Sequence, residues 1–513
     1  MARPPEFVES HRKPQHQRGH LVKKYNLFIG GEHVAPESGS WFDTENPYTA
    51  ATWAQIPEGT AEDVDKAARA AHDALHRGAW SEMSPSQRGA VLRRIGDVIA
   101  DRARELAEVE VLDNGKLFSE MYGQLTYLPQ WFYYYGGLAD KIEGTVVPVD
   151  KKGYFLYTQK QPLGVVGIIT PWNSPLMLLA WKLAPALAAG CTAVIKPSEF
   201  TSASTLELAA LLDEAGVPPG VVNVVTGFGA TVGAPLVEHP LVSKISFTGS
   251  DQTGRQINES AARNLKHVSL ELGGKSPNVV FADADLDAAA NGVISGIFAA
   301  TGQTCIAGSR LLVQDTIHDD FVDRLVGLAR SARMGDPMLE STDVGPITTA
   351  QQYEKVLDYI DIARSEGATF ALGGHAAQHP ECDRGRFVEP TILTDVRNEM
   401  RIAQEEVFGP VLSVIPFHDE DDAVAIANDV RYGLGAGVWT SDIARAFRMS
   451  ERITSGTVWV NTYRAVSYMA PFGGMKDSGI GRENGLHAID EFLDTKSVWI
   501  NTGAPTASPF VMR

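Results

Sequence analysis

Residues 164–169 read Gly-Val-Val-Gly-Ile-Ile, and this short run indicates the fold class of the chain. It is rich in β-branched residues and bounded by turn-forming residues, which is typical of a strand buried on both faces. Segments with helical and strand character then alternate. Helices are expected over residues 176–189, 201–215 and 230–238, and strands over 193–196, 221–225 and 244–248. The alternation predicts an α/β fold with a parallel sheet covered by helices on both faces.

A second alternating region extends from about residue 278 to residue 461. Its expected strands include residues 311–313, 369–372 and 413–417, and its expected helices include 319–331 and 349–366. Upstream of both regions, residues 61–79 and 84–112 have the apolar spacing of surface helices. We therefore expect two consecutive doubly wound parallel-sheet domains. Residues 140–159 and 490–501 belong to neither domain and have the pattern of β ribbons.

Composition limits the partners of this chain. Its 513 residues exceed the size of one hydrophobic core, so two or three domains are expected. The net charge of −18 opposes phosphate backbones and anionic lipid surfaces, so we expect neither nucleic acid nor a membrane as a partner. The longest apolar run, residues 176–195, contains Lys182 and Pro185 and predicts a buried helix and strand rather than a membrane span.

The cysteines and histidines limit the metal sites, the disulfides and the cellular compartment that can be expected. Cys191, Cys305 and Cys382 form neither a metal-binding spacing nor a paired framework, which favours a reducing compartment and a cytoplasmic location. The histidines show no His-Glu-x-x-His motif, so no catalytic metal is expected. Residues 1–24 are polar and basic without an apolar core, which indicates a loose arm rather than a secretory signal.

A cysteine and a glutamate stand out as candidate catalytic residues. Cys305 ends the run Gly302-Gln303-Thr304-Cys305, between a helix-like stretch and a strand-like run, and Glu271 begins Glu-Leu-Gly-Gly-Lys. A thiolate attacks a polarised carbonyl carbon readily, so the pair suggests an enzyme that forms a thioester and then hydrolyses it. By itself, Cys305 could equally be one more small buried residue, because most free cysteines are.

Several further motifs accompany these two. They are Pro171-Trp172-Asn173, Lys196-Pro197-Ser198-Glu199, Phe247-Thr248-Gly249-Ser250, Glu405-Glu406-Val407-Phe408-Gly409-Pro410 and Pro471-Phe472-Gly473-Gly474-Met475-Lys476. Together with the runs around Glu271 and Cys305, they resemble the NAD(P)-dependent aldehyde dehydrogenase superfamily in content and in order. The resemblance extends from about Tyr25 to Trp499, nearly the whole chain.

The resemblance implies a division of the chain. Residues 1–24 are expected to form an N-terminal arm, 25–139 with 160–273 a dinucleotide-binding domain, and 274–470 a catalytic domain. Residues 140–159 and 487–513 are expected to supply a β-ribbon oligomerisation flap and the C-terminal tail. A homodimer or a homotetramer is expected.

The resemblance also implies a cofactor site. The expected contacts are Ile169, Thr170, Pro171, Trp172, Lys196, Ser198, Glu199, Gly229, Gly233, Phe247, Gly249, Ser250, Thr253, Leu272, Gln352, Lys355, Glu406 and Phe408. Many lie at turns from strands into helices, where dinucleotides bind parallel sheets. The glycines miss the usual Gly-x-Gly-x-x-Gly spacing and, taken alone, favour plain tight turns.

One pair in this set bears on the choice of cofactor. Lys196 and Glu199 match residues that hold the adenosine ribose in the family, and a carboxylate there accepts from a 2′-hydroxyl but repels a 2′-phosphate. NAD is therefore expected rather than NADP. The alternative interpretation is a solvated lysine and a helix-capping acid.

For catalysis, the resemblance implies that Cys305 is the nucleophile, that Asn173 donates to the oxyanion, and that Glu271 activates the hydrolytic water. Lys182 and Glu483 match positions proposed to relay the proton outward. Asn173 could instead cap the following helix, and Lys182 with Glu483 could be a purely structural pair. Because members that transfer the acyl group to coenzyme A usually lack the carboxylate at the Glu271 position, a free acid product is expected.

The sequence identifies the substrate pocket less specifically than it identifies the catalytic and cofactor residues. The expected lining is Trp131, Tyr135, Met177, Leu178, Trp181, Ile306, Arg464, Val466 and Phe472, with Tyr134 nearby. This lining suits an aliphatic, aromatic or ring-bearing aldehyde, although such residues pack cores far more often than they contact ligands. Arg464 could bind a distal carboxylate, which would favour a semialdehyde, or could be a solvated loop residue.

Two other classes of protein compete with this interpretation. A thiol acyltransferase or hydrolase without a redox cofactor would explain Cys305 and Glu271, but it would leave the turns at Lys196 and Gly249 unused. A non-catalytic relative, such as the lens crystallins that share the family's fold, would be expected to lose the thiol or the base. This chain keeps both.

Overall fold

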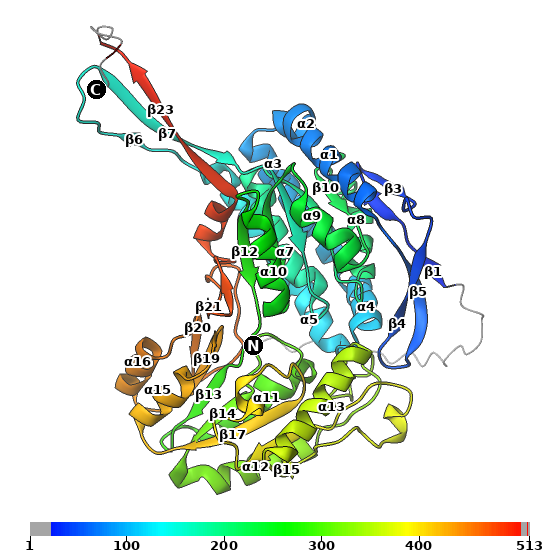
Figure 1. Ribbon diagram of the computed structural model, residues 1–513, viewed down its shortest axis with the longest axis vertical. Coiled ribbons are helices and arrows are strands. Elements are labelled where there is room, and N and C mark those ends of the chain that lie inside the picture. Colours follow the sequence, from blue (N-terminus) through cyan, green and yellow to red (C-terminus); the bar gives the residue numbers. More distant parts are fainter. Residues whose placement is uncertain (1–21, 504–509, 511–513) are drawn as a thin grey trace, which may run out of the picture.

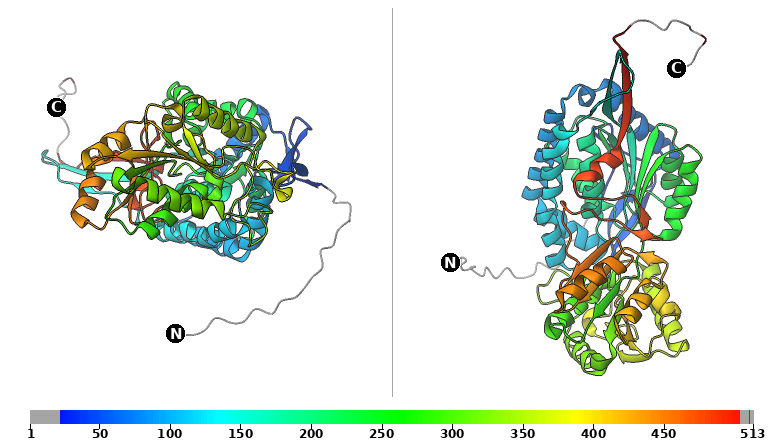
Figure 2. Two further views of the ribbon diagram at one scale, coloured as in Figure 1. Left: turned by 90° about the horizontal axis from the view of Figure 1, so that it is seen from below. Right: turned by 90° about the vertical axis from the view of Figure 1, so that its left-hand side faces the viewer.

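The computed structural model describes residues 22–503 and residue 510. Two layered α/β bodies lie one above the other, and a narrow β ribbon projects from the upper body (Figure 1). Views turned by 90° show the same ribbon extending beyond the helices (Figure 2). The predicted α/β class with two successive sheets and a ribbon is therefore what the chain adopts.

The upper body is built on a sheet whose middle strands are parallel. Its order is β22 (Gly479–Ile480), β12 (His267–Glu271), β11 (Val242–Thr248), β8 (Val165–Ile169), β9 (Thr192–Lys196), β10 (Val222–Val224), β2 (Leu27–Ile29) and β3 (Glu32–Val34). The run that opened the sequence analysis becomes β8, and all its residues are buried.

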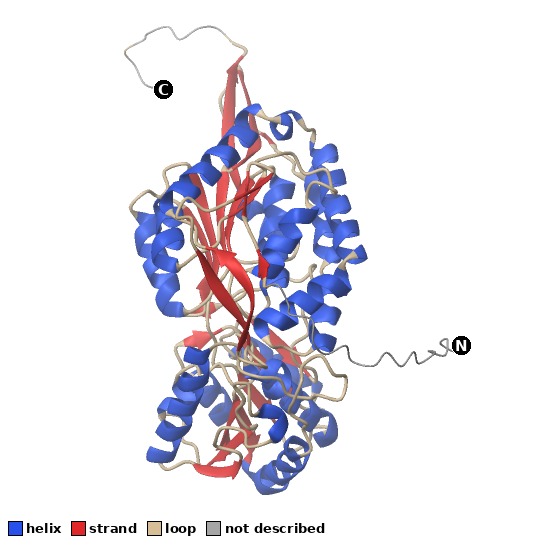
Figure 3. Ribbon diagram, turned by 90° about the vertical axis from the view of Figure 1, so that its right-hand side faces the viewer, coloured by secondary structure: helices blue, strands red, loops and turns tan. Residues whose placement is uncertain are grey.

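Helices cover both faces of this sheet because β8 is apolar on both (Figure 3). Val166 and Ile168 belong to a core shared with α3 (Pro85–Asp101), α4 (Ala103–Asn114), α5 (Phe118–Tyr127), α6 (Pro129–Leu138), α7 (Pro175–Ala189) and α8 (Ala203–Leu211). Val165 and Ile169 pack into a second core with α1 (Ala61–Arg77), α9 (Ala234–Glu238) and α10 (Asp251–Ala262). The short α2 (Ala79–Glu82) follows α1. Alternate residues of one strand thus hold two layers of helices.

The lower body repeats this plan. Its order is β15 (Thr369–Leu372), β16 (Thr391–Thr394), β17 (Val411–Phe417), β14 (Arg310–Gln314), β13 (Pro277–Val280), β19 (Gly435–Trp439) and β20 (Thr457–Val460). On one face lie α11 (Leu286–Phe298) and α12 (His318–Arg330). On the other lie α13 (Ala350–Ser365), α14 (Arg401–Gln404), α15 (Glu420–Asn428) and α16 (Ile443–Arg452).

Two small sheets and the ribbon complete the chain. One small sheet joins β1 (Lys23–Lys24), β5 (Ala51–Pro57) and β4 (Trp41–Asn46), and another pairs β18 (Tyr432–Gly433) with β21 (Met475–Lys476). In the ribbon, β23 (Leu493–Asn501) pairs antiparallel with β7 (Tyr154–Pro162), which also pairs with β6 (Val146–Val147). The two ribbon segments predicted far apart in sequence therefore lie side by side.

Three expectations differ from the structure. The helix expected over residues 84–112 is two helices, because the backbone of Arg102 leaves the helical region between α3 and α4. The helix expected over 230–238 begins as a π turn, Gly229–Gly233, before α9. Of the arm expected over residues 1–24, residues 1–21 lie outside the described residues, and Lys23–Lys24 forms β1 instead of a loose segment.

Between residues 22 and 503, none of the helices has both the length and the apolar character that crossing a membrane requires.

Candidate active site

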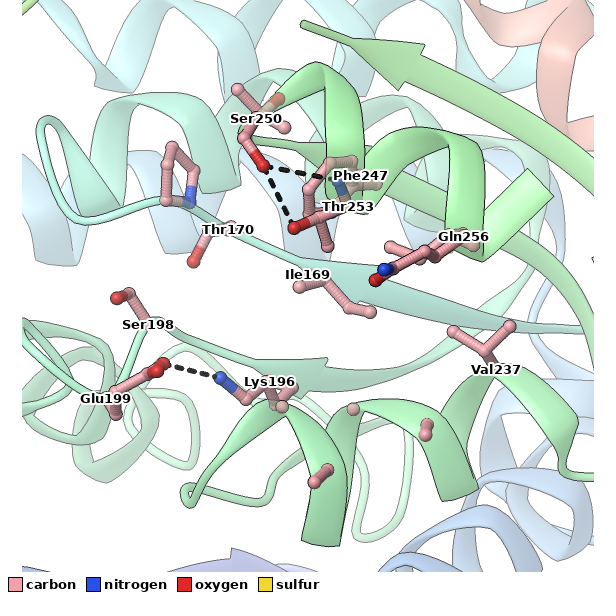
Figure 4. Close-up of a pocket in the computed structure, with 18 of the residues that line it drawn as sticks. Ile169, Thr170, Lys196, Ser198, Glu199, Val237, Phe247, Ser250, Thr253 and Gln256 are labelled. Carbon is pink, nitrogen blue, oxygen red and sulfur yellow. Dashed lines mark hydrogen bonds and ion pairs between the residues drawn. The ribbon is translucent and has the colours of Figure 1, made fainter. Parts of the chain in front are cut away.

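A cleft opens where the middle strands of the upper sheet end. Its larger part is a cavity of about 700 Å³ at the carboxyl ends of β8, β9 and β11 (Figure 4). Pro171 and Trp172 follow β8, Lys196 ends β9, and Gly249 follows β11. The carboxyl edge of a parallel sheet is the usual place for a dinucleotide, because strands turn there into helices whose N–H groups face outward.

Polar groups are arranged along this cavity. The Lys196 Nζ donates to the Glu199 carboxylate at 3.0 Å. The Ser250 side chain caps α10 by accepting from the Thr253 N–H at 3.2 Å, and its hydroxyl bonds that of Thr253 at 2.9 Å. Figure 4 shows the Lys196–Glu199 pair across the cavity from Ser250 and Thr253.

A smaller cavity of about 130 Å³ continues the cleft toward the lower body. The two cavities share Pro171, Trp172, Thr248, Gly249 and Ser250, so they are parts of one site. Asn173 and Cys305 line the smaller part. The thiol therefore lies at one end of a cleft long enough to extend to Lys196 and Glu199.

Every residue expected from the sequence to contact a cofactor lines one of these two cavities. Residues that sequence reasoning missed are Phe200, Ala230, Ala234, Val237, Glu238, Thr248, Gln256, Ile257, Ser260 and Gly273. Helical periodicity could have found some of them, because Gln256, Ile257 and Ser260 lie one and two turns beyond Thr253 on α10.

The lower rim of the small cavity is held by backbone contacts. The Glu406 carboxylate accepts the Gly274 N–H at 2.9 Å, and the Gln352 amide donates to the carbonyls of Val407 and Phe408 at 2.8 and 3.0 Å. The Phe408 ring meets the Trp172 ring edge-on, with centroids 5.2 Å apart. Polar groups and an aromatic ring are thus fixed in the cavity that the thiol also lines.

Cys305 follows a tightly constrained turn. Ala300 and Thr301 both have left-handed backbone angles, with φ of 53° and 54°. Such conformations cost about 1–3 kcal/mol each in residues other than glycine and persist only where the surroundings enforce them. Here the Ala300 N–H donates to Glu120 at 2.8 Å, and the Thr301 hydroxyl donates to the Gly345 carbonyl at 3.1 Å. The nucleophile candidate therefore sits on a strained and pinned loop.

The electrostatic surroundings keep the thiol protonated. Burial raises the pKa of Cys305 to about 12, and the nearby carboxylates of Glu271 and Glu406 act in the same direction. Because the thiolate is the reactive form, Cys305 needs a base to take its proton.

Asn173 lies directly against the loop that carries Cys305. Its side-chain amide donates to the Gln303 carbonyl at 2.9 Å, and Gln303 is itself fixed by the carbonyl of Pro346 and the N–H of Thr348. A carboxamide carries two N–H groups, so the second can point at an atom bound to Cys305. Ser174, not Asn173, precedes the first residue of α7, and neither caps it through a side chain.

Glu271 ends β12 and is buried beside a second ionisable pair. Burial raises its pKa well above the usual carboxyl value, the Glu483 carboxylate raises it further, and Lys182 and Arg482 oppose this. Lys182 and Glu483 form a hydrogen-bonded ion pair that is almost completely buried. The structure thus brings together the residues expected to handle protons.

The residues expected to line the substrate pocket gather in one apolar cluster. Trp131, Tyr135, Met177, Trp181, Ile306 and Phe472 are buried in it, and Leu178 and Val466 pack against it. Trp131 and Tyr135 are fully enclosed and donate to Asn484 and to the Gly485 carbonyl, as core side chains do. Tyr468, which sequence reasoning missed, contacts the rings of Tyr127, Trp131 and Tyr134.

The Arg464 side chain is hydrogen-bonded within the protein. Its guanidinium donates to the Ser295 carbonyl at 2.9 Å, and its backbone is left-handed, with φ of 63°.

Over residues 22–503, the structure brings no three His, Cys, Asp or Glu side chains into a group that could hold a metal ion.

The family model described as the aldehyde dehydrogenase family matches residues 33–498. The chain belongs to the aldehyde dehydrogenase family. The resemblance seen in the sequence, the expected fold and the expected enzyme class are thereby confirmed.

Similar members of the family are found among characterised and solved proteins. A (Z)-2-((N-methylformamido)methylene)-5-hydroxybutyrolactone dehydrogenase of Acinetobacter baylyi is 46% identical over 496 residues, covering 96% of this chain and all of the relative. The structure of betaine aldehyde dehydrogenase of Staphylococcus aureus in complex with NAD+ has a TM-score of 0.93 at 39% identity and covers 95% and 97% of the two chains. An aldehyde dehydrogenase of Bacillus cereus, also solved with NAD+, has a TM-score of 0.91 at 43% identity, covering 94% and 97%.

Proposed function

We propose that this aldehyde dehydrogenase oxidises an aldehyde to the free carboxylic acid with NAD, through a thioester on Cys305. The observation that carries the proposal is the shared lining of the cleft. Cys305 and Asn173 line the end of a cavity whose other end holds Lys196 and Glu199, and Glu271 is buried next to the thiol. A thiol acyltransferase or hydrolase would need no such cleft beyond its acyl site.

The residues of the cleft fit NAD. Lys196 and Glu199 would hold ribose hydroxyls, the start of α10 would offer N–H groups to a phosphate, and Glu406 and Phe408 would contact the nicotinamide ribose and ring. NAD bound there would supply a hydride acceptor for the substrate carbon attached to Cys305, so that loss of the hydride leaves that carbon as a thioester.

The first step forms a carbon–sulfur bond. Glu271 takes the thiol proton, the Cys305 sulfur attacks the aldehyde carbon, and the carbonyl electrons move to oxygen. The Asn173 side-chain N–H and the Cys305 backbone N–H donate to this oxyanion. Because both donors are fixed by the fold before the reaction, they stabilise developing charge without reorganising.

The second step breaks the carbon–sulfur bond. Glu271, again unprotonated, takes a proton from water as its oxygen attacks the thioester carbon, and the departing Cys305 sulfur takes that proton from Glu271. A general base works best with a pKa near the ambient pH, and the buried position of Glu271 raises its pKa in that direction. The Lys182–Glu483 ion pair, whose charges act on Glu271, would receive from it the thiol proton of the first step.

The cofactor preference gives a first prediction. Wild-type enzyme should have a kcat/KM for NAD at least about tenfold above that for NADP, since the Glu199 carboxylate repels a 2′-phosphate. Lys196, the one cation among the described residues lining the larger cavity, is neutralised by Glu199. Glu199→Gln should narrow this ratio, mainly through the KM for NADP. A tenfold preference of the wild type for NADP would overturn the assignment.

The apolar cluster suggests the substrate class. Trp181, Phe472 and Tyr468 belong to the same apolar cluster as Cys305, and the Tyr127 ring contacts that of Tyr468. Such rings favour aliphatic chains and aromatic groups. The Arg464 guanidinium already has a partner in the Ser295 carbonyl, so it does not need a substrate carboxylate. The proposal is therefore an apolar or aromatic aldehyde rather than a semialdehyde.

Mass spectrometry of the protein tests the function directly. After mixing with NAD+ and hexanal, benzaldehyde or succinic semialdehyde, we expect a transient acyl adduct on the peptide that contains Cys305, and accumulation of hexanoate or benzoate. Cys191 and Cys382 are buried elsewhere and should stay unmodified. Absence of both the adduct and the acid with all three aldehydes would contradict the proposal.

The ribbon supports a homodimer or homotetramer. It extends away from the body and exposes Phe155, Trp499 and Ile500, apolar side chains that solvent does not favour (Figure 1). We include this assembly in the proposal, and the mass in solution by light scattering tests it.

A cytoplasmic location is also part of the proposal, since the three cysteines are free thiols.

A further inference from the structure

Buried polar side chains run along one face of β11 and β12, from the cleft toward the amino ends of the two strands. Lys244, Ser246 and Thr248 alternate along β11, and Ser269 and Glu271 alternate along β12. All five are buried. We call them the polar row. Buried strands of a parallel sheet are normally apolar on both faces, and the opposite face of β11, with Ile245 and Phe247, follows that rule.

Strand register brings the row together. Ser246 is paired with Ser269 and Thr248 with Glu271, and directly paired residues in a sheet project to the same side. The hydroxyls of Ser246 and Ser269 are hydrogen-bonded at 3.0 Å, in the middle of the row. The row therefore crosses the sheet from Glu271, at the carboxyl end of β12, to Lys244, near the amino end of β11.

The outer end of the row reaches the surface. The Lys244 Nζ donates to the Glu491 carboxylate at 3.3 Å, and their side chains are 1% and 34% exposed. Glu491 also lies close to the middle of the row, because a methyl group built on Gly481 would be 3.3 Å from Ser269 Cβ and 3.4 Å from Glu491 Oε2. Glu491 thus joins the buried row to solvent.

The inner end contains oxygens that need a further partner. Within the described residues, nothing hydrogen-bonds to Glu271 Oε2, Thr248 Oγ1 or Glu483 Oε2, and all three atoms are buried. Buried polar groups in proteins are satisfied by water where protein offers nothing, so this end suits bridging water between the acid and the hydroxyls.

The charges around the row fit the passage of a proton. Lys244 faces Glu491, Glu483 and the Cys191 thiol, and burial lowers its pKa, so it gives up a proton more readily than an exposed lysine. Glu271 faces Glu483, Lys182 and Arg482. Glu483 is thus electrostatically coupled to both ends of the row.

We propose that the polar row, ending in the Lys244–Glu491 pair, is the outlet through which the proton taken up by Glu271 leaves the protein. This inference rests on the proposed function. It extends the outlet beyond Lys182 and Glu483 and assigns its exit to Glu491.

The transfer balances as a relay of one proton per hydrolysed thioester. Before hydrolysis, Glu271 passes the proton that it took from the Cys305 thiol to the Lys182–Glu483 pair, and through bridging water the hydroxyls of Ser269 and Ser246 each receive a proton on oxygen and release their own. Lys244 passes a proton to the Glu491 carboxylate and takes one from the Ser246 side, and Glu491 releases it to solvent. Within the relay only O–H and N–H bonds form and break; the C–O bond that forms and the C–S bond that breaks belong to hydrolysis of the thioester.

The test measures acid release in a single turnover by rapid quenching. Glu491→Gln keeps the size of the side chain and an acceptor for Lys244 but cannot take up a proton. We expect it to slow acid release about tenfold, less than loss of the base itself, which typically costs about 10²–10⁴. The preceding formation of NADH should change less than twofold. Imidazole should restore the rate in proportion to its concentration, because a small base can collect the proton instead.

A second variant tests the outlet without changing the Lys244–Glu491 pair. Ser246→Ala with Ser269→Ala removes the central hydroxyls with little change of volume, and it should also slow acid release without slowing NADH formation. Asp490→Asn is the matched control, because Asp490 adjoins Glu491 but pairs with Lys160. It should release acid at the wild-type rate.

The possible outcomes separate the two proposals. Unchanged acid release in both row variants, or a slower release that imidazole does not restore in Glu491→Gln, would refute the outlet while leaving the proposed function intact. If wild-type enzyme forms neither NADH nor acid, the proposed function fails and the outlet falls with it.

Discussion

In Glu271→Gln enzyme, NADH should still form to about one equivalent per active site, more slowly than in wild type because Glu271 no longer takes the thiol proton, while release of the acid nearly stops. The amide is isosteric with the acid but cannot take a proton from water, so the thioester on Cys305 persists. General-base catalysis contributes about 10²–10⁴ to a rate, and the steady-state rate should fall by this amount. Stopped-flow absorbance of NADH shows the burst, and quenched samples show the missing acid.

The pH dependence gives an independent check of Glu271. Only its unprotonated form is a base, and its raised pKa means that this form is lost at a higher pH than for an exposed carboxylate. Acid release by wild-type enzyme should therefore rise with pH through this raised pKa and then level off, and the residual rate of Glu271→Gln should lack that rise. Full steady-state turnover by the variant would show that another group is the base.

Asn173→Ala should lower kcat/KM for the aldehyde by about 10²–10³, the typical cost of losing one oxyanion donor. The loss should appear before NADH forms, because the oxyanion develops when Cys305 attacks. Affinity for NAD should be nearly unchanged. Pre-steady-state NADH formation with a saturating aldehyde measures the affected step.

The control for Asn173 is another buried asparagine. Asn223 donates to the carbonyls of Ala193 and Gly220 in the upper sheet, away from the thiol. Asn223→Ala should lower the melting temperature without changing kcat/KM. If Asn173→Ala does the same and nothing more, its role is to brace the Gln303 loop rather than to stabilise charge.

Local sequence patterns were sufficient for much of the fold. The strand expected over residues 369–372 is β15, and the helix expected over 349–366 is α13 with one residue fewer at each end, because propensity and period agree there. The break at Arg102 was not visible, since both sides of it continue a helical apolar pattern. The π turn before α9 is likewise set by packing and not by any local signal.

The candidate site was predictable where motifs follow strand ends. Lys196 and Gly249 come directly after buried strands, so topology alone brings them to one edge. Tyr468 and the Ser246–Ser269 pair were not predictable in this way. The partner of a ring or a hydroxyl depends on tertiary packing and strand register, which the spacing within one segment does not specify.

The short strand β22 limits how far the upper and lower bodies can move relative to each other. The chain passes from the upper body to the lower one just after Glu271, and it returns to hydrogen-bond β22 along β12, with Gly479 paired to Glu271. These bonds hold the two crossings side by side next to the base, so rotation of the lower body has to bend both of them at once. We therefore expect the distance between the two halves to change little during turnover, and the coenzyme to enter and depart by rotating about its own bonds and by displacing side chains.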